Sequence, residues 1–532
     1  MAQREPAPEG GRATDRDALR GRGPLRRPRP DLSKADRDAI MGASRQLFGG
    51  IMMPNSRPTP SERIHSRLGH PVIDADGHYL EFQPALDRYL QEEGVEPSTI
   101  LAGELSLGVG TWGYVGMDPD ERIRRRASRT AWWAAPTSNT LDLATATFPA
   151  LLNERLDELG IDFVIMYGSA ALVYPLIPDD EIRRGACRAI NRYAADAFAD
   201  YADRMTPAAV IPMNTPDEAI EMLDFAVGEL GLKAVMIAGL VQRPVEDPSG
   251  GAYNVWWDTL GLDSPYDYDP FWQRCLDLGI SPACHSGSMG IGLRRSTSTY
   301  MYNHVGHFAA ASEAFAKALF FGGVTERFPD LRVGLLEGGA HWGVGLYGDL
   351  LSRWQKRNRE AILTYDPKRV DGTLFEELAR KYGGVLVERA GATAPETTGR
   401  WAEDGPFDDF AATGAESLED VRDRFVPNFF FGCEADDPMT ATAFDRDRIP
   451  LGAAISAMFS SDIGHWDVPE MTEVLEEAFE NVERGWLDAR QFRDFVFGNA
   501  LRFYTDTNRD FFRGTVVAAA VETELSRPRE TG

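Results

Sequence analysis

The chain has 532 residues, of which 43% are hydrophobic, and it carries a formal net charge of -26. This hydrophobic content supports a large buried core, and the acidic surface argues against nucleic acid and membrane partners because it repels phosphate groups. The four cysteines form no CxxC pair, which argues against a disulfide framework and a thiolate zinc site. Since no apolar run is long enough to span a bilayer and the first residues lack the apolar core of a secretory signal, we expect a cytoplasmic protein.

The sequence divides into three parts. Residues 1–66 form an N-terminal extension, in which Arg, Pro, Gly and Asp dominate the first 35 residues. This composition predicts disorder, because few large apolar side chains are present to offset the entropy of ordering. A helix is expected at Ala35–Phe48, followed by a Pro-punctuated linker. Residues 67–510 form the main domain, and residues 511–532 form a C-terminal tail.

Short apolar segments alternate with longer helical patterns in the main domain, which is typical of a parallel sheet with crossover helices. The expected strands are Val72–Asp76, Phe163–Tyr167, Ala208–Pro212, Ala234–Ile237, Ile280–His285, Arg332–Glu337, Phe429–Cys433 and Ala457–Asp462. Helices are expected at Ile182–Tyr201, Pro216–Leu230, Ala309–Phe320 and Pro469–Glu480. Eight such strands predict an α/β fold, a closed (β/α)8 barrel with loop insertions.

Three segments are predicted to be insertions: Val95–Pro149, Gly239–Pro270 and residues 366–427. The first two follow the first and fourth strands, and in such a barrel the loops after the strands form the catalytic face. The second insertion contains Tyr253, Trp256, Trp257, Tyr266 and Tyr268. These aromatic side chains either line a pocket for a ring-bearing substrate or pack the loop onto the barrel, and the sequence favours neither interpretation.

Acidic and imidazole side chains gather at the carboxyl ends of three expected strands. Asp76 and His78 project from the same side of the first strand, together with Asp74, because strand side chains alternate. His285 ends the fifth strand and Asp462 ends the eighth. In a closed barrel these ends meet around one axis, so the set predicts one divalent metal site with mixed nitrogen and oxygen ligands. Zinc suits this set, and manganese or iron would also fit.

The same motifs resemble the amidohydrolase superfamily, specifically the amidohydrolase-related branch that includes aminocarboxymuconate-semialdehyde decarboxylase. Asp74-Ala-Asp-Gly-His78 resembles the Asp-x-His-x-His motif of its first strand, with Asp76 in place of the first His. Cys284-His-Ser-Gly287 resembles the fifth-strand ligand segment, and Phe459–Trp466 the eighth-strand segment whose Asp binds metal. The resemblance implies a metal-dependent TIM barrel, with Asp76, His78, His285 and Asp462 as ligands. It also implies a homodimer.

The sixth strand departs from the family pattern. Decarboxylases of this family usually carry a His at its end, whereas this chain has Glu337 in Leu336-Glu-Gly-Gly-Ala-His341. Glu337 could donate a proton if its pKa were raised, or act as a base or a neighbour of the metal. His341 either fills the vacancy or is a polar residue at a helix start. His465 either protonates the leaving group or caps the surface after the eighth strand.

Three functions compete. The first is a metal-dependent hydrolase acting on a small, ring-bearing molecule, in which Asp462 takes a proton from a metal-activated water. The second is a non-oxidative decarboxylase of an aromatic or enoic acid, which needs a cationic clamp such as Arg294 or Arg295. The third is a non-catalytic scaffold barrel. The missing sixth-strand His favours the hydrolase. His304 and His307, three residues apart, are expected on one helical face, either as a second site or as polar residues at the helix start.

Overall fold

Eight parallel strands form the central sheet of the protein. The structure is a computed structural model, and it describes residues 57–101, 117–129, 135, 138–245, 255–285, 287–393 and 408–527. The strands, in sheet order, are β1 (Ile73–Tyr79), β2 (Phe163–Gly168), β3 (Met205–Ile211), β4 (Ala234–Ile237), β7 (Pro282–Cys284), β8 (Val333–Leu335), β9 (Phe429–Glu434) and β10 (Ser456–Ser460). Almost every residue in them is buried, as expected for a parallel sheet that is covered on both faces.

The sheet closes into a barrel where β10 meets β1. The two strands lie in contact. The backbone N–H of Asp462 donates to the carbonyl of Asp76 over 3.0 Å, and the N–H of His78 donates to the carbonyl of Ile463 over 2.7 Å. The buried Asp74 carboxylate reinforces this seam, since it accepts the backbone N–H of Ser461 at 2.9 Å and also the Ser461 hydroxyl. The seam therefore joins the end of the first strand to the end of the last.

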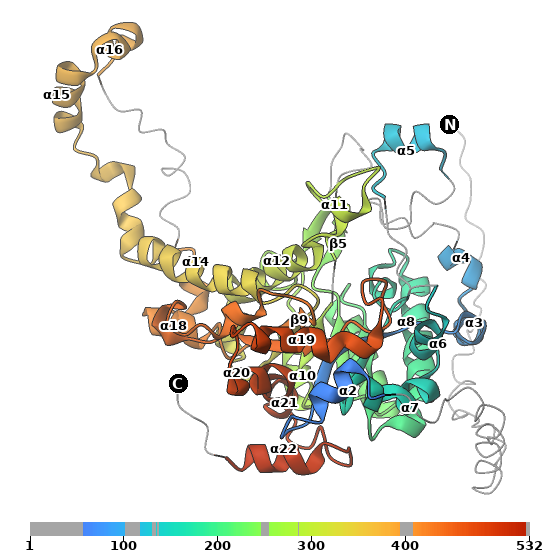
Figure 1. The fold of residues 1–532 in the computed structure, drawn as a ribbon. Helices are drawn as coiled ribbons and strands as arrows, with labels where there is room; N and C mark the ends of the chain where they lie inside the picture. The colour runs from blue at the N-terminus through green and yellow to red at the C-terminus, as the bar shows by residue number, and fades with distance from the viewer. Residues whose placement is uncertain are drawn as a thin grey trace, which may run out of the picture. The chain divides into compact units, whose positions relative to one another are not determined.

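Helices surround the strands (Figure 1). They are α2 (Pro60–His65), α3 (Gln83–Glu92), α4 (Pro97–Leu101), α5 (Pro119–Arg125), α6 (Thr140–Thr147), α7 (Pro149–Leu159), α8 (Asp180–Phe198), α9 (Pro216–Leu223), α10 (Asp269–Asp277), α11 (Tyr300–His304), α12 (His307–Phe321), α13 (Val324–Arg327), α14 (His341–Arg357), α15 (Gly372–Tyr382), α16 (Gly384–Ala390), α18 (Leu418–Asp423), α19 (Val474–Glu483), α20 (Ala489–Arg493), α21 (Asn499–Thr505) and α22 (Ala518–Leu525).

Helix α8 shows why these segments are helical. Asp179 caps its N-terminus by accepting the N–H groups of Glu181 and Ile182, and acidic residues in the first turn suit the positive end of the helix dipole. Its buried residues, Ile190 and Tyr193 among them, recur at helical spacing and form one face. That face packs against β3 and α3, so burial holds the helix on the outside of the barrel.

The (β/α)8 barrel predicted from the sequence is confirmed, because all eight expected strands are present and parallel. The 239–270 insertion contains an additional antiparallel hairpin, β5 (Val241–Pro244) with β6 (Val255–Asp258). In that insertion Tyr268 is buried and donates to the carbonyl of Met213 over 2.5 Å, so this ring packs the loop onto the barrel. Tyr253 lies outside the described residues, as does the helix expected at Ala35–Phe48.

Both ends of the described chain pack onto the barrel unit, which spans Pro58–Gly532. Thr59 caps α2, and α2 contacts α7 and α19. Near the other end, Phe511, Phe512 and Val521 are buried in the core. Within the described ranges, no helix is both long enough and apolar enough to cross a bilayer.

Replacing Asp74 tests the seam. We expect Asp74→Ala to lower the free energy of unfolding by about 3 kcal/mol, because buried backbone donors of Asp76 and Ser461 lose their acceptor. The control is Asp157→Ala, which removes a largely exposed ion pair with Arg204 and is expected to cost less than about 1 kcal/mol. Chemical denaturation of both chelator-treated variants measures the difference. Equal stabilities would show that the seam does not depend on Asp74.

Candidate metal centre

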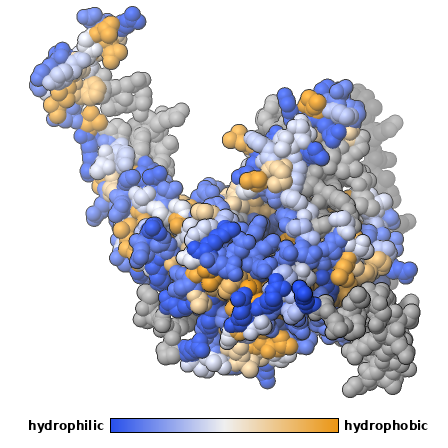
Figure 2. Space-filling view, viewed as in Figure 1, coloured by the Kyte–Doolittle hydropathy of each residue, from blue (hydrophilic) through white to orange (hydrophobic). Residues whose placement is uncertain are grey.

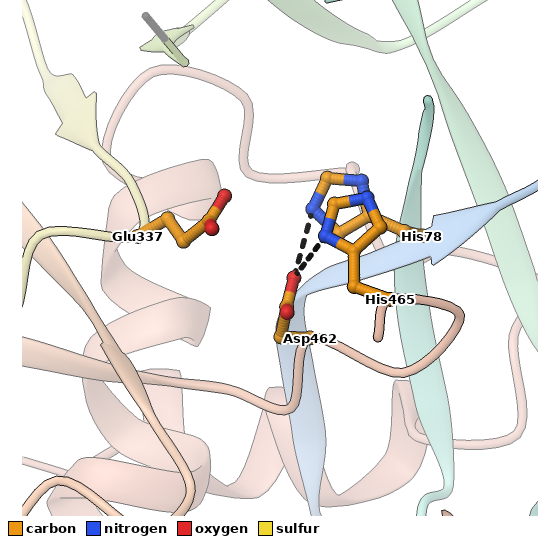
Figure 3. Close-up of side chains that lie close together, drawn as sticks. All are labelled: His78, Glu337, Asp462 and His465. Atoms are coloured by element: carbon orange, nitrogen blue, oxygen red, sulfur yellow. Dashed lines mark ion pairs between the residues drawn. The ribbon is translucent and has the colours of Figure 1, made fainter. Parts of the chain in front are cut away.

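The centre begins with Asp76 and His78 on β1. Both side chains are buried, and they lie close together although the pairing of β1 with β2 shifts register between Asp74 and Gly77. The Nε2 atom of His78 lies 3.3 Å from Oδ1 of Asp76. Figure 3 shows the His78 ring extending from the end of β1 toward the residues that follow β8 and β10. One strand thus presents an imidazole and a carboxylate to a shared point.

His285, directly after β7, reaches the same point. Its Nε2 atom lies 3.2 Å from Nε2 of His78 and 3.6 Å from Oδ2 of Asp76. The ring is buried and packs edge-on against Phe308 at 5.1 Å between centroids. Because two imidazole nitrogens face each other at this distance, the arrangement resembles two ligands of one ion more than two members of an apolar core.

Asp462 approaches from the opposite side of the barrel seam. It follows β10, and its Oδ1 atom lies 3.3 Å from Nε2 of His78. Its backbone adopts φ 54°, a left-handed conformation that is uncommon for a residue with a side chain. The hydrogen bond from its N–H to Asp76 holds it there. The structure therefore gathers the four residues that the sequence indicated as metal ligands around His78. Asp76 and His285 form one group of mutually close potential ligand atoms with His78, and Asp462 belongs to a second group that also contains His78.

Glu337 is a fifth donor at this centre. It follows β8 with φ 53°, is buried, and places Oε2 3.3 Å from Nε2 of His285. Figure 3 shows its carboxyl group pointing toward His78 and Asp462. Together with His78, Asp462 and His465 it forms a group whose potential ligand atoms all lie within 4.8 Å of one another. The sixth strand thus delivers a carboxyl group to the position where a His was expected.

The buried carboxylate oxygens of this centre are suited to binding a cation. In the part of the chain that the structure describes, no donor forms a hydrogen bond to either carboxylate oxygen of Asp76 or of Glu337, although all four oxygens are buried. Buried carboxylates without donors are costly unless a metal or a proton neutralises them. Two imidazoles and three carboxyl groups are also the ligand types that divalent transition metals take. The donor set therefore fits the expected metal.

His465 lies beside this donor set. Its ring stacks on His78 with centroids 3.7 Å apart, and its Nδ1 lies 2.7 Å from Oδ1 of Asp462. Its Nε2 lies 3.2 Å from the hydroxyl of Ser169. The chain turns back at Gly464, where φ is 95° and a Cβ would overlap the carbonyl oxygen of His78. The interpretation of His465 as a surface cap is wrong, since the side chain is fully buried.

The structure does not bring His341 into the centre. This residue begins α14, is exposed, and does not belong to either group of potential metal ligands among the described residues. It lies beside Gly339, close to the carboxyl group of Asp437, a residue that follows β9. His341 thus occupies a helix start, away from the donor set.

The segment after β7 contains His304 and His307, which the sequence offered either as a second site or as polar residues at a helix start. His304 and His307 lie on different helices, contrary to the shared helical face expected, because Gly306 breaks the chain between them at φ 69°. The Tyr300 hydroxyl lies 2.6 Å from Nδ1 of His304, and Nε2 of His304 lies 3.8 Å from Oδ2 of Asp467. Asp467 acts electrostatically on the centre as well, raising the pKa of Glu337.

Burial shifts the pKa values at the centre in opposite directions. It lowers the pKa of His78 to about 3 and that of His285 to about 4, so both rings are neutral near pH 7 and can offer a lone pair. Burial also raises the pKa of Asp76 to about 6 and those of Glu337 and Asp462 well above the usual range for carboxyl groups. The protein alone therefore disfavours negative charge here, and a cation would reverse that preference.

Part of this chain is similar to known proteins. Residues 154–365 match the family model described as Amidohydrolase. The γ-resorcylate decarboxylase of Rhodococcus jostii (strain RHA1) is 26% identical over 217 residues, and that of Polaromonas sp. (strain JS666) is 24% identical over 215 residues. Each alignment covers 40% of this chain and 60% of the relative, so the chain spans less than two thirds of either relative.

Among solved structures, a dihydroxybenzoic acid decarboxylase from Polaromonas sp. JS666, with bound manganese and the inhibitor 2-nitroresorcinol, aligns with a TM-score of 0.45 and 15% identity. That alignment covers 84% of this chain and 99% of the other. Residues 154–365 of this chain are thus similar to the Amidohydrolase family.

Proposed function

We propose that the protein is a metal-dependent decarboxylase that removes carbon dioxide from a hydroxylated aromatic acid. The observation that carries this proposal is the convergence of the buried Asp76, His285 and Asp462 side chains on His78. Two curated relatives are γ-resorcylate decarboxylases, which supports the decarboxylase hypothesis better than the hydrolase that the sequence alone favoured. A scaffold without activity would have no physical need for carboxylates buried without hydrogen-bond donors.

Asp76, His78, His285 and Asp462 would hold one divalent ion. When bound, the ion would polarise substrate oxygens and neutralise their negative charge. The two imidazoles suit zinc, the metal favoured from the sequence, and the carboxylates of Asp76 and Asp462 also suit manganese. His465 would position Asp462 through their 2.7 Å contact, as residues behind metal ligands commonly do.

Glu337 would donate the proton in this reaction. As the bond between the ring and its carboxylate breaks, the electron pair stays on the ring carbon, which takes a proton, and carbon dioxide leaves. Glu337 is the protein acid whose carboxyl group points into the centre from β8, opposite His465 (Figure 3). After product release it regains a proton from solvent, so the substrate exchanges carbon dioxide for one proton.

The departing carboxylate needs a positive partner before it leaves. Arg294 lies in the loop after β7, where its guanidinium donates to the carbonyl of Val305 at 2.9 Å and its charge acts on His307. This places a cation on the same loop as His285. We propose Arg294, ahead of the more exposed Arg295, as the group that orients the substrate carboxylate.

Hydrolysis remains the second candidate function, and one observation favours it: the family's sixth-strand His is replaced by Glu337. In that reaction Asp462 would accept a proton from the attacking water while Glu337 protonates the leaving group. The two reactions differ in their products, since only decarboxylation releases carbon dioxide.

Metal content tests the ligand set. We expect the purified wild-type protein to carry roughly one zinc or manganese ion per chain by elemental analysis, and His285→Ala to lose most of it, because one of few nitrogen ligands disappears. The control is His65→Ala, which removes an imidazole paired with Asp162 at 2.7 Å outside the centre and should leave the metal in place. Metal loss in both variants, or in neither, would contradict the assignment.

Product analysis tests the reaction. We expect metal-loaded protein to release carbon dioxide from 2,6-dihydroxybenzoate or a related hydroxybenzoate, measured by mass spectrometry alongside the decarboxylated ring. The same preparation is incubated with a panel of aryl amides, esters and lactones. Hydrolysis of that panel without release of carbon dioxide from any acid would replace the proposed reaction with the second candidate.

Glu337→Gln tests the proton donor. We expect kcat for decarboxylation to fall by about 100-fold, because the amide keeps the shape of the side chain but cannot donate its proton in the same way. Metal content should persist, since the four proposed ligands remain. Glu154→Gln, on the exposed side of α7, is the matched control and should retain full activity. An active Glu337→Gln enzyme would assign the proton to another group.

A further inference from the structure

A serine that follows β2 contacts the imidazole behind Asp462. The Ser169 hydroxyl lies 3.2 Å from Nε2 of His465, whose ring is fully buried. Hydrophilic residues cover much of the molecular face shown in Figure 2, where water can satisfy their polar atoms. A polar ring away from water instead needs protein partners for its nitrogen atoms. Ser169 is therefore in a place to determine which hydrogen bond Nε2 makes.

Backbone hydrogen bonds hold Ser169 in this place. Its own N–H donates to the carbonyl of Tyr79, the last residue of β1, over 3.1 Å. The carboxyl group of Glu81 accepts the N–H of Ala170 at 3.0 Å and that of Ala171 at 3.3 Å. The end of β1, which is the strand that supplies two of the proposed metal ligands, thus fixes the loop after β2.

Gly168 allows the loop to approach the end of β1 this closely. A Cβ at this position would overlap a carboxyl oxygen of Glu81 and would lie 2.8 Å from the hydroxyl of Tyr79. A larger residue would push the loop away from β1 and would therefore move Ser169 away from His465.

The two nitrogens of His465 take opposite roles. Nδ1 lies 2.7 Å from Oδ1 of Asp462, and a carboxylate that binds a metal is ionised, so it can only accept a hydrogen bond. Burial disfavours a charged ring, so the imidazole carries a single proton, and that proton lies on Nδ1. Nε2 is then an acceptor, and the hydroxyl of Ser169 is its donor.

We propose that Ser169 is a positioning residue, which keeps the proton of His465 on Nδ1 and thereby holds Asp462 in place for the metal. This inference rests on the metal site of the proposed function. Figure 3 shows the His465 ring beside the His78 ring, and their centroids are 3.7 Å apart. A stacked ring can still turn over and exchange its nitrogen and carbon edges, and a hydroxyl aimed at Nε2 opposes that change.

Metal affinity tests the role of Ser169. We expect Ser169→Ala to raise the dissociation constant for zinc at least about tenfold, measured by competition with a chromophoric chelator, because partners behind metal ligands commonly have an effect of this size. Ser169→Thr keeps a hydroxyl and should bind zinc as the wild type does. The control is Ser281→Ala, which removes a buried hydroxyl that donates to the carbonyl of Phe503 over 2.7 Å at the amino end of β7. It should leave the zinc affinity unchanged.

Histidine-selective 15N NMR of the zinc-loaded protein locates the proton directly. We expect the ring signals of His465, assigned by their absence in His465→Asn, to show a protonated Nδ1 and an unprotonated Nε2 in the wild type. In Ser169→Ala these signals should move toward those of a mixture of both tautomers. A role of Ser169 in folding alone would not change them.

The outcomes separate this inference from the proposed reaction. Wild-type zinc affinity in Ser169→Ala overturns the inference, as does a proton on Nε2 of His465 in the wild type. Equal losses of zinc affinity in Ser169→Ala and Ser169→Thr also overturn it, since only one of these variants lacks the hydroxyl. A protein whose zinc affinity depends on Ser169 as expected, but which releases no carbon dioxide from any acid, supports the inference and contradicts the proposed decarboxylation.

Discussion

The seam between β1 and β10 is the constraint on which the rest of the structure depends. Hydrogen bonds from Asp462 to Asp76 and from His78 to Ile463 hold the first and last strands together across nearly 400 residues of intervening chain. Asp76, His78 and Asp462 also belong to the donor set. The hydrogen bonds that close the barrel therefore also bring the donor atoms together. The Asp74 carboxylate stabilises the seam by accepting the backbone N–H groups of Asp76 and Ser461, while the Asp76 side chain faces the centre.

Local sequence patterns were sufficient to predict the eight strands and to indicate the four proposed metal ligands. Buried apolar segments mark the strands, and a polar residue that ends such a segment, as His285 does after β7, has few roles other than in a site. In a closed barrel the carboxyl ends of the strands meet around one axis, so the residues at these ends are expected to lie close together. The position of Glu337 was likewise predicted from its motif, although its orientation toward His285 depends on a left-handed backbone that no local pattern indicated.

What the sequence could not predict depends on turns and tertiary packing. His465 lies over His78 because Gly464 reverses the chain. His304 and His307 lie on different helices because Gly306 interrupts the helix between them, although their ring centroids are only 5.2 Å apart. Each turn contains a glycine, but a glycine in the sequence does not by itself predict the direction that the chain takes after it. The β5–β6 hairpin was also missed, since its strands are four residues long and β5 ends in a proline.

Left-handed backbone at Glu337 and Asp462 has a consequence for how this enzyme could be stabilised. Each such residue costs the folded state on the order of 1–3 kcal/mol, and glycine would relieve that strain. A screen for thermal stability is therefore expected to select glycine at these two positions, where the gain in stability comes from removing carboxyl groups that face the proposed metal site. At Glu337 and Asp462, a substitution that raises thermal stability would remove a carboxyl group that is proposed to act in the reaction. Stabilising substitutions that preserve activity are therefore expected at other positions of the barrel.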